Sequence, residues 1–291
     1  MSIERTALFR LATSERVERA VKRAPGGKAA AWRAASRYVA GRSRSDALDT
    51  AAMLVEQGHG VSVDLFGERV RDPAAADRVL DDYVQLVGVL PAPPADVWLS
   101  VDLSHLALGT DASAVAERLA AIACALPAGR RVQVGAEEAA HADAVLACVL
   151  DVAARGLADR VGATVQANLL RSPGDADALA DAGVHVRLVK GAYVERIAAH
   201  PYGEPTDVAF LRLGFRLAER GAVWSMATHD ARLREALLLA RSMVPVEQLL
   251  GVRPESLNEL RARDVPTRIY VPYGADWFRY WLRRLAESRG A

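Results

Sequence analysis

The sequence predicts an α/β fold, a closed (β/α)8 barrel of the TIM type that follows a short helical segment. From Gly60 onward, short β-branched runs alternate with longer helical patterns, which is typical of βα units and a parallel sheet. Eight such runs occur, and eight favour a closed barrel over a doubly wound sheet of roughly five or six strands. A length of 291 residues suits one barrel, which typically needs about 250 residues.

The predicted elements follow one another at regular intervals. Helix formers separated by Gly41 and serines predict two helices first, at residues 29–40 and 45–57. The eight predicted strands lie at residues 61–65, 97–101, 131–134, 163–167, 184–189, 222–227, 245–250 and 267–271. We therefore expect an N-terminal helical segment over residues 1–57 and a barrel over residues 58–291.

The overall composition favours small-molecule chemistry. A formal net charge of +1 indicates no basic face for nucleic acid, and 51% hydrophobic with 25% charged residues is ordinary for a globular protein. No apolar run reaches about 18 residues, and charges interrupt the apolar positions of residues 1–21. We expect a cytoplasmic protein with at most peripheral membrane contact.

Polar residues follow several predicted strands, at the end of the barrel where the chemistry takes place. They include Asp64, Asp102, His105, Glu137, Gln166 and His229. Residues 187–193 add Arg187 and Lys190, which we expect on one side of the fifth strand end. The small residues Gly191 and Ala192 would let a flat, anionic ligand such as reduced flavin approach the backbone. The alternative is that both cations pair with neighbouring carboxylates.

Residues 187–193 resemble the fifth-strand motif of the FAD-dependent proline dehydrogenase family, and further similarities follow in the same order. Residues 63–68 resemble that family's first-strand motif, Gln166 with residues 170–173 its fourth, and residues 227–230 its sixth. Residues 271–277, continuing through residues 280–287, are similar to its eighth strand and final helix. The resemblance therefore covers nearly the whole predicted barrel.

The resemblance implies a flavin-dependent dehydrogenase of amino-acid metabolism that acts on CH–NH groups. Such an enzyme passes a hydride from the carbon beside the nitrogen to flavin N5, releases an imine, and uses a quinone as electron acceptor. The residues implied to contact FAD are Ala136, Gln166, Arg187, Lys190, Gly191, Ala192, Thr228, His229 and, near the adenosine, Glu287. Arg187 would lie nearest the reactive edge of the flavin ring and would be catalytic.

The final predicted helix is implied to hold the substrate. By resemblance, Arg283 and Arg284 grip its carboxylate, Tyr193 and Tyr280 pack against its carbon skeleton, and Glu68 pairs with Arg283 in the empty site. Helical geometry supports this, because positions 280, 283, 284 and 287 fall on one face. The alternative is a solvated arginine pair near a helix carboxyl end.

Three positions depart from the family pattern, all on the substrate side. Asp102 stands where the family carries a lysine, Gly135 where it carries an aspartate, and Leu250 where it carries a tyrosine. We therefore expect a substrate other than proline. Asp102 would recognise a positively charged nitrogen or act as the base that removes its proton.

Two other functions stay open. The altered residues would also suit a catalytically inactive barrel that binds flavin or another ligand. A metal-dependent hydrolase is the weaker alternative, because His105, His141 and His229 are scattered and no His-x-His pair follows the first strand. We expect no metal. The absence of a Gly-x-Gly-x-x-Gly sequence excludes a Rossmann cofactor domain.

Overall fold

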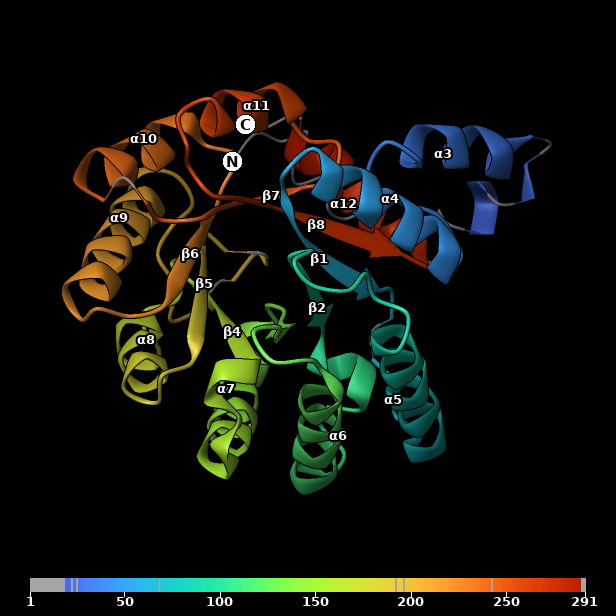
Figure 1. Ribbon diagram of the computed structural model, residues 1–291, viewed down its shortest axis with the longest axis horizontal. Helices are drawn as coiled ribbons and strands as arrows, with labels where there is room; N and C mark the ends of the chain where they lie inside the picture. Colours follow the sequence, from blue (N-terminus) through green and yellow to red (C-terminus); the bar gives the residue numbers. More distant parts are fainter. Residues whose placement is uncertain are drawn as a thin grey trace.

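Eight parallel strands close into a barrel, with β1 paired to β8 (Figure 1). The computed structural model describes residues 19–21, 23–24, 26–67, 69–191, 193–195, 197–241 and 243–288, without the side chains at 279, 283 and 285–288. The strands are β1 (Gly60–Leu65), β2 (Val97–Val101), β3 (Val132–Val134), β4 (Val161–Gln166), β5 (His185–Val189), β6 (Trp224–Ala227), β7 (Val246–Leu249) and β8 (Thr267–Tyr273).

Helices cover the outside of the barrel. They are α3 (Gly27–Ala35), α4 (Arg44–Glu56), α5 (Pro73–Val87), α6 (Ala112–Ala125), α7 (Ala142–Val152), α8 (Ser172–Asp181), α9 (Glu204–Glu219), α10 (Ala231–Ala240), α11 (Pro254–Arg261) and α12 (Trp277–Ser288). Within the described part of the chain, none of these helices is both long and apolar enough to cross a membrane.

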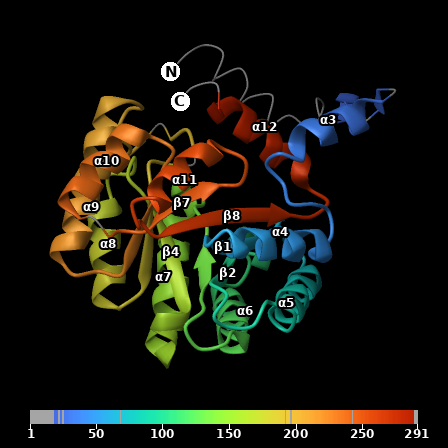
Figure 2. The same ribbon diagram turned by 45° about the horizontal axis from the view of Figure 1, so that its top comes forward.

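The helix beside β8 comes from the start of the chain. Helix α4 packs against both β8 and β1, and its Ala47, Ala51 and Leu54 lie in the same buried cluster as the strand residues. Helix α12, which follows β8, packs instead against α3. Figure 2 shows α12 and α3 above β8, with α4 below it. The last helix of the chain is therefore displaced from the ring toward one end of the barrel.

The predicted barrel is confirmed, and every predicted strand end lies within two residues of the observed one. The first helix is shorter than expected, so the prediction for residues 36–40 was wrong. Those residues leave the helix because the chain turns toward β8, where Ala40 N donates to the carbonyl oxygen of Pro272 at 2.9 Å and Gly41 pairs with Tyr273. The domain boundary at residue 57 stays a prediction.

Strand residues alternate between an apolar outer face and a polar lumen. Val61 and Val63 belong to the apolar cluster beneath the helices, whereas Ser62 between them lies 3.3 Å from Nη2 of Arg187 on β5. Deeper in the lumen, the ring of His185 lies 5.2 Å from that of Trp98 on β2. Branched apolar side chains usually fill such barrels. Because polar side chains fill this one, each of them needs a partner.

The apolar layer between strands and helices should carry most of the stability. Phe210 on α9 is fully buried, whereas Phe215 on the same helix is 40% exposed. We expect Phe210→Ala to lower the free energy of unfolding by about 3–5 kcal/mol, because it leaves a cavity. Phe215→Ala is the matched control and should change it by less than about 1 kcal/mol. Urea denaturation measures both, and equal losses would contradict this assignment of the core.

Candidate active site

The carboxyl ends of the strands open on the side of the barrel where α12 lies. Tyr280 connects α12 with the strand ends. Its ring centroid is 5.0 Å from that of Phe66, just after β1, and 6.2 Å from that of Tyr270 on β8. The guanidinium of Arg284 lies over the Tyr280 ring at 4.9 Å. Two of the residues expected to hold a substrate therefore lie over the mouth of the barrel.

Arg187 is buried inside the barrel and held by an ion pair. Its Nε donates to Oε2 of Glu247 on β7 at 2.7 Å, and its Nη2 lies 2.7 Å from the same oxygen. Its Nη2 also donates to Oγ of Ser62 at 3.3 Å. Burial alone would raise the pKa of Glu247, but Arg187, Arg268 and His185 lower it to about 2. The carboxylate is therefore ionised at any ordinary pH.

Lys190 lies in different surroundings. Its Nζ is 2.5 Å from Oδ1 of Asp207 on α9 and 3.4 Å from Oδ2 of Asp230, which caps α10. Arg187 and Lys190 thus have separate carboxylate partners, and their expected position on one side of the strand end stays a prediction. The alternative that both cations pair with carboxylates describes their contacts correctly.

The segment after β5 comes close to the end of β4. Asn168 N donates to the carbonyl oxygen of Lys190 at 2.9 Å, and a Cβ at Gly191 would collide with the Asn168 amide. Only glycine fits there. Gln166 Nε2 donates to the carbonyl oxygen of Glu137 at 2.8 Å, and Tyr193 donates its hydroxyl to that of Ala136 at 3.2 Å. Predicted cofactor residues from β3, β4 and β5 therefore lie together.

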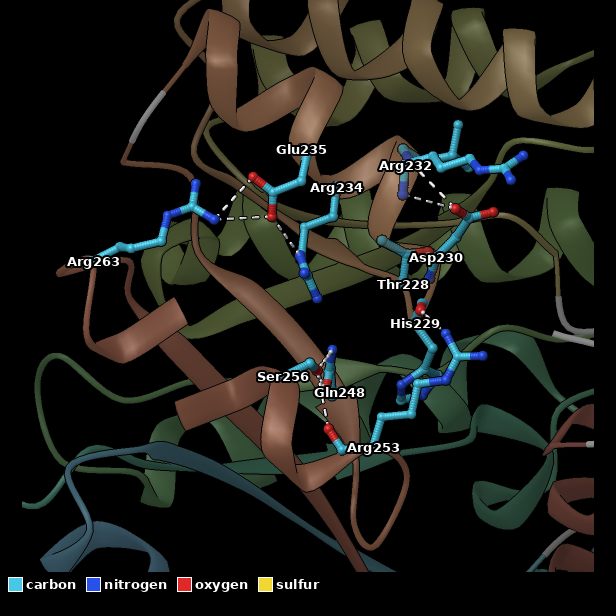
Figure 3. A network of polar contacts seen from close by, with 11 residues as sticks. Thr228, His229, Asp230, Arg232, Arg234, Glu235, Gln248, Arg253, Ser256 and Arg263 are labelled. Atoms are coloured by element: carbon cyan, nitrogen blue, oxygen red, sulfur yellow. Dashed lines mark hydrogen bonds and ion pairs between the residues drawn. The ribbon is translucent and has the colours of Figure 1, made fainter. Parts of the chain in front are cut away.

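His229 follows β6 in a cluster of arginines (Figure 3). Its Nε2 accepts from Leu249 N at 3.4 Å, and its carbonyl oxygen accepts from Nη1 of Arg253 at 3.0 Å. Burial, then Arg284 and Arg253, lowers the pKa of His229 to about 4, so the ring is neutral at pH 7. Thr228 caps the same turn by accepting from Asp230 N at 3.1 Å.

Asp64 forms a buried cluster with two tyrosines. Its Oδ1 lies 3.2 Å from the Tyr83 hydroxyl, and its Oδ2 accepts a short hydrogen bond from the Tyr270 hydroxyl. Burial raises the pKa of Asp64 to about 7, although both tyrosines and then Arg187 act to lower it. The group can therefore change its protonation state near neutral pH.

Asp102 and Gly135 are neighbours. A Cβ at position 135 would collide with Oδ1 of Asp102, so the carboxylate occupies the space that a side chain at 135 would need. The two departures from the family pattern are thus one physical unit, since the aspartate fits only because residue 135 is glycine.

Two buried polar atoms on either side of β5 suit a bound cofactor. Nδ1 of His229 and Oδ1 of Asn168 have no hydrogen-bond partner among the described residues. Buried groups of this kind normally have a partner in the protein, a water or a ligand. One atom lies after β6 and the other after β4, so the pair fits the polar edges of a flat ring system lying across β5.

Known proteins identify the family. A model described as proline dehydrogenase matches residues 47–291 of this chain. The chain belongs to the proline dehydrogenase family. The proline dehydrogenase of Deinococcus radiodurans is 30% identical over 271 residues, which cover 88% of this chain and 87% of the relative. Proline dehydrogenase 1 of Bacillus subtilis is also 30% identical, over 87% of this chain and 86% of the relative.

Two solved structures of longer proteins are similar to this chain. Proline utilization A (PutA) from Bdellovibrio bacteriovorus, inactivated by N-propargylglycine, matches with a TM-score of 0.81 and 20% identity over 98% of this chain. A Bradyrhizobium japonicum PutA mutant, D778Y, matches with a TM-score of 0.73 and 26% identity over 94% of this chain. This chain spans 36% and 33% of those two proteins, so it resembles about a third of each.

Membership of the proline dehydrogenase family confirms the predicted resemblance, while the roles of individual residues stay predictions. Glu68 and Ala192, and the side chains of Arg283 and Glu287, lie outside the described residues. Helix α12 does span positions 280–287, so those four predicted positions share a helix. Among the described residues, no three His, Cys, Asp or Glu side chains are grouped to hold a metal ion.

Sequence reasoning missed Glu247, Tyr83, Tyr270 and Asn168. Glu247 and Tyr270 lie inside predicted strands, where the polar members of the alternating pattern indicate the lumen. Tyr83 lies on α5 and has no local signal, because only the fold brings its hydroxyl to Asp64.

The Asp64 cluster makes stability depend on pH. The ordinary pKa of the carboxyl is 3.8 and burial raises it to about 7, so between these values the folded protein keeps a proton that the unfolded chain has released. The free energy of unfolding should therefore fall as pH rises through this window. Asp64→Asn keeps the acceptor oxygen without the titration, and its slope should be smaller.

Urea denaturation at several pH values from 5 to 8 measures this slope. Glu259→Gln, which changes an exposed carboxylate on α11, is the control and should keep the slope of the unaltered protein. If Asp64→Asn also kept it, Asp64 would be ionised in the folded protein throughout the range.

Proposed function

We propose that the chain is an FAD-dependent dehydrogenase that oxidises the C–N bond of proline or a related amino-acid-like amine to an imine. The unsatisfied atoms on either side of β5 carry this proposal within the proline dehydrogenase family. Besides Nδ1 of His229 and Oδ1 of Asn168, Nη1 of Arg187 donates no hydrogen bond to the described residues, since the bonds of this guanidinium come from Nε and Nη2. Three polar atoms from neighbouring strands are thus available to one ligand.

A bound flavin supplies the acceptor for the hydride. The residues that would hold it are Gln166, Arg187, Lys190, Gly191, Thr228 and His229. Arg187 contributes a fixed positive charge, because Glu247 and Ser62 hold its guanidinium in place. His229 contributes a neutral ring with one donor and one acceptor. The positive charge of Lys190 would attract a ligand less strongly than that of an unpaired lysine, because the carboxylates of Asp207 and Asp230 lie beside it.

The substrate would lie between the flavin and α12. Arg284, together with Arg283, would bind a carboxylate, since a guanidinium matches two carboxylate oxygens at once. The buried ring of Tyr280 would cover the carbon skeleton and exclude water. As the family resemblance implies, a quinone would accept the electrons from the reduced flavin.

We propose further that the preferred substrate is not proline. Asp102 puts a negative charge where a lysine would put a positive one, a change of two units, and one close charge pair is worth about 4 kcal/mol near a protein surface. A substrate with a positively charged nitrogen near Asp102 would gain from this exchange, and Asp102 would then remove its proton. The same exchange favours the second candidate, a barrel that binds flavin without catalysing a reaction.

A flavin assay with a substrate panel tests the function. The purified protein should show a flavin absorbance spectrum, directly or after reconstitution with FAD. Proline and other cyclic or N-substituted amino acids should bleach it to different extents, with at least one compound bleaching faster than proline. Failure to bind flavin would sink the proposal, and tight flavin binding without bleaching by any amine would support the inactive barrel.

Restoring the pair at positions 102 and 135 tests the substrate assignment. The combined variant Asp102→Lys with Gly135→Asp should oxidise proline faster, because it returns the charge pattern of the family. Gly135→Asp alone should not, because its side chain would collide with the Asp102 carboxylate and add like charge beside it. Asp102→Asn separates the loss of negative charge from the gain of a cation. The test is the steady-state rate of the unaltered protein and of the three variants, with proline as the varied substrate. An unchanged rate of proline oxidation in the combined variant would count against the assignment.

A further inference from the structure

Glu247 is a buried carboxylate that pairs with Arg187 and is not among the residues proposed to contact the cofactor or the substrate. It lies on β7, inside the barrel, and is 3% exposed. Its Oε2 is 2.7 Å from both Nε and Nη2 of Arg187, and its Oε1 accepts from Oγ of Ser225 on β6 at 2.5 Å. Both carboxylate oxygens are therefore held, and the side chain has one orientation.

We propose that Glu247 is a positioning residue for Arg187 that also lowers the reduction potential of the flavin. This inference rests on the proposed function, because it concerns the cofactor that Arg187 would contact. Nε and Nη2 of Arg187 donate to Glu247 and Ser62, so Nη1 is the guanidinium nitrogen left to donate to a ligand. The ion pair thus fixes which atom the cofactor meets.

Arg268, a second buried cation of the lumen, already has its own partners. Nη2 of Arg268 on β8 pairs with Asp96 at 2.5 Å, Nη1 donates to the carbonyl oxygen of Val61 at 2.8 Å, and the guanidinium lies 3.3 Å from the centre of the Trp98 ring. Glu247 is therefore not needed to neutralise Arg268. Glu247 accepts hydrogen bonds from Arg187 and Ser225, and among the charged groups around it Arg187 lowers its pKa most, ahead of Arg268 and His185.

The charge of Glu247 matters apart from its hydrogen bonds. A reduced flavin carries negative charge, which a nearby arginine stabilises. A carboxylate bonded to that arginine offsets its charge, and in a buried site such an effect is little screened. The reduced form is then less stabilised, so the potential is lower than Arg187 alone would give. Glutamine at this position would keep an acceptor oxygen for Arg187 without the charge.

The experiment measures flavin properties of the loaded protein instead of turnover. We expect Glu247→Gln to raise the flavin reduction potential in a dye-linked titration. It should also bind sulfite, an anion that adds reversibly to oxidised flavin, about tenfold more tightly, which is roughly the effect of one full charge at about 10 Å with an effective dielectric constant of about 20. Ser225→Ala is the matched control, because it removes a bond to Glu247 but keeps the carboxylate; its sulfite affinity should stay within about twofold.

Loss of a buried charge could also prevent folding, so Glu247→Asp provides a second variant. It keeps the charge but withdraws it from Arg187, and its sulfite affinity should fall between those of the unaltered protein and Glu247→Gln. An unchanged potential and sulfite affinity in flavin-loaded Glu247→Gln, or in Glu247→Asp if only that variant folds, would overturn the inference. If the unaltered protein bound no flavin, the proposed function would fail instead, which keeps the two failures distinct.

Discussion

The buried ion pair between Arg187 and Glu247 is the constraint around which the barrel is organised. An unpaired charge inside a closed barrel is expensive, so each charged residue in the lumen requires another at a fixed distance. That requirement ties β5 to β7 and, through Ser62, to β1. It also explains why small hydroxyl residues, Ser62 and Ser225, lie where a TIM barrel usually has branched apolar side chains. The lumen therefore contains hydrogen-bonding and charged side chains in place of the apolar side chains that would otherwise pack there.

The same constraint connects the floor of the barrel with its mouth. Arg268 and Trp98 fill the end where the strands begin, Glu247 and Arg187 the middle, and Asp64 with Tyr270 the region toward α12. Each layer contacts or electrostatically influences the next. A substitution near the floor can therefore change the electrostatics at the mouth without touching a ligand.

Most of the fold could be predicted from the sequence because its signals are local. Eight strands of alternating or branched residues, with helices between them, indicate a barrel whatever their order in space. Two features could not be predicted in this way. Residues 36–40 look helical but leave the helix, and Ala40 bonds to Pro272 in β8. Helix α4, from the N-terminal segment, packs against β8 and β1. Both depend on contacts between distant parts of the chain.

The residues of the candidate site also fall into two groups, those found in local sequence motifs and those placed by contacts between distant parts of the chain. Arg187, Lys190, Gly191, Gln166 and His229 stand in short motifs, so a resemblance identifies them. The direction of the Lys190 side chain could not be predicted from a motif, because it is decided by Asp207 and Asp230 on two other elements. Glu247 and Tyr83 belong to no predicted motif, and their importance appears only when the strands are closed. Asp102 and Gly135 are intermediate. Each departure from the family pattern can be read from the sequence, but only the structure shows that the Asp102 carboxylate occupies the space of a side chain at position 135.

The position of α4 has a consequence for how the barrel forms. Until β8 is made, β1 is an edge strand with one unpaired side, and such edges invite pairing with other chains. The amino-terminal part of a chain is synthesised first, and α4 precedes both strands and packs against both. It can therefore shield β1 while the intervening strands are still being added. When β8 is added, both β1 and α4 are present to pair and pack with it, so α4 provides part of the surface on which the barrel closes.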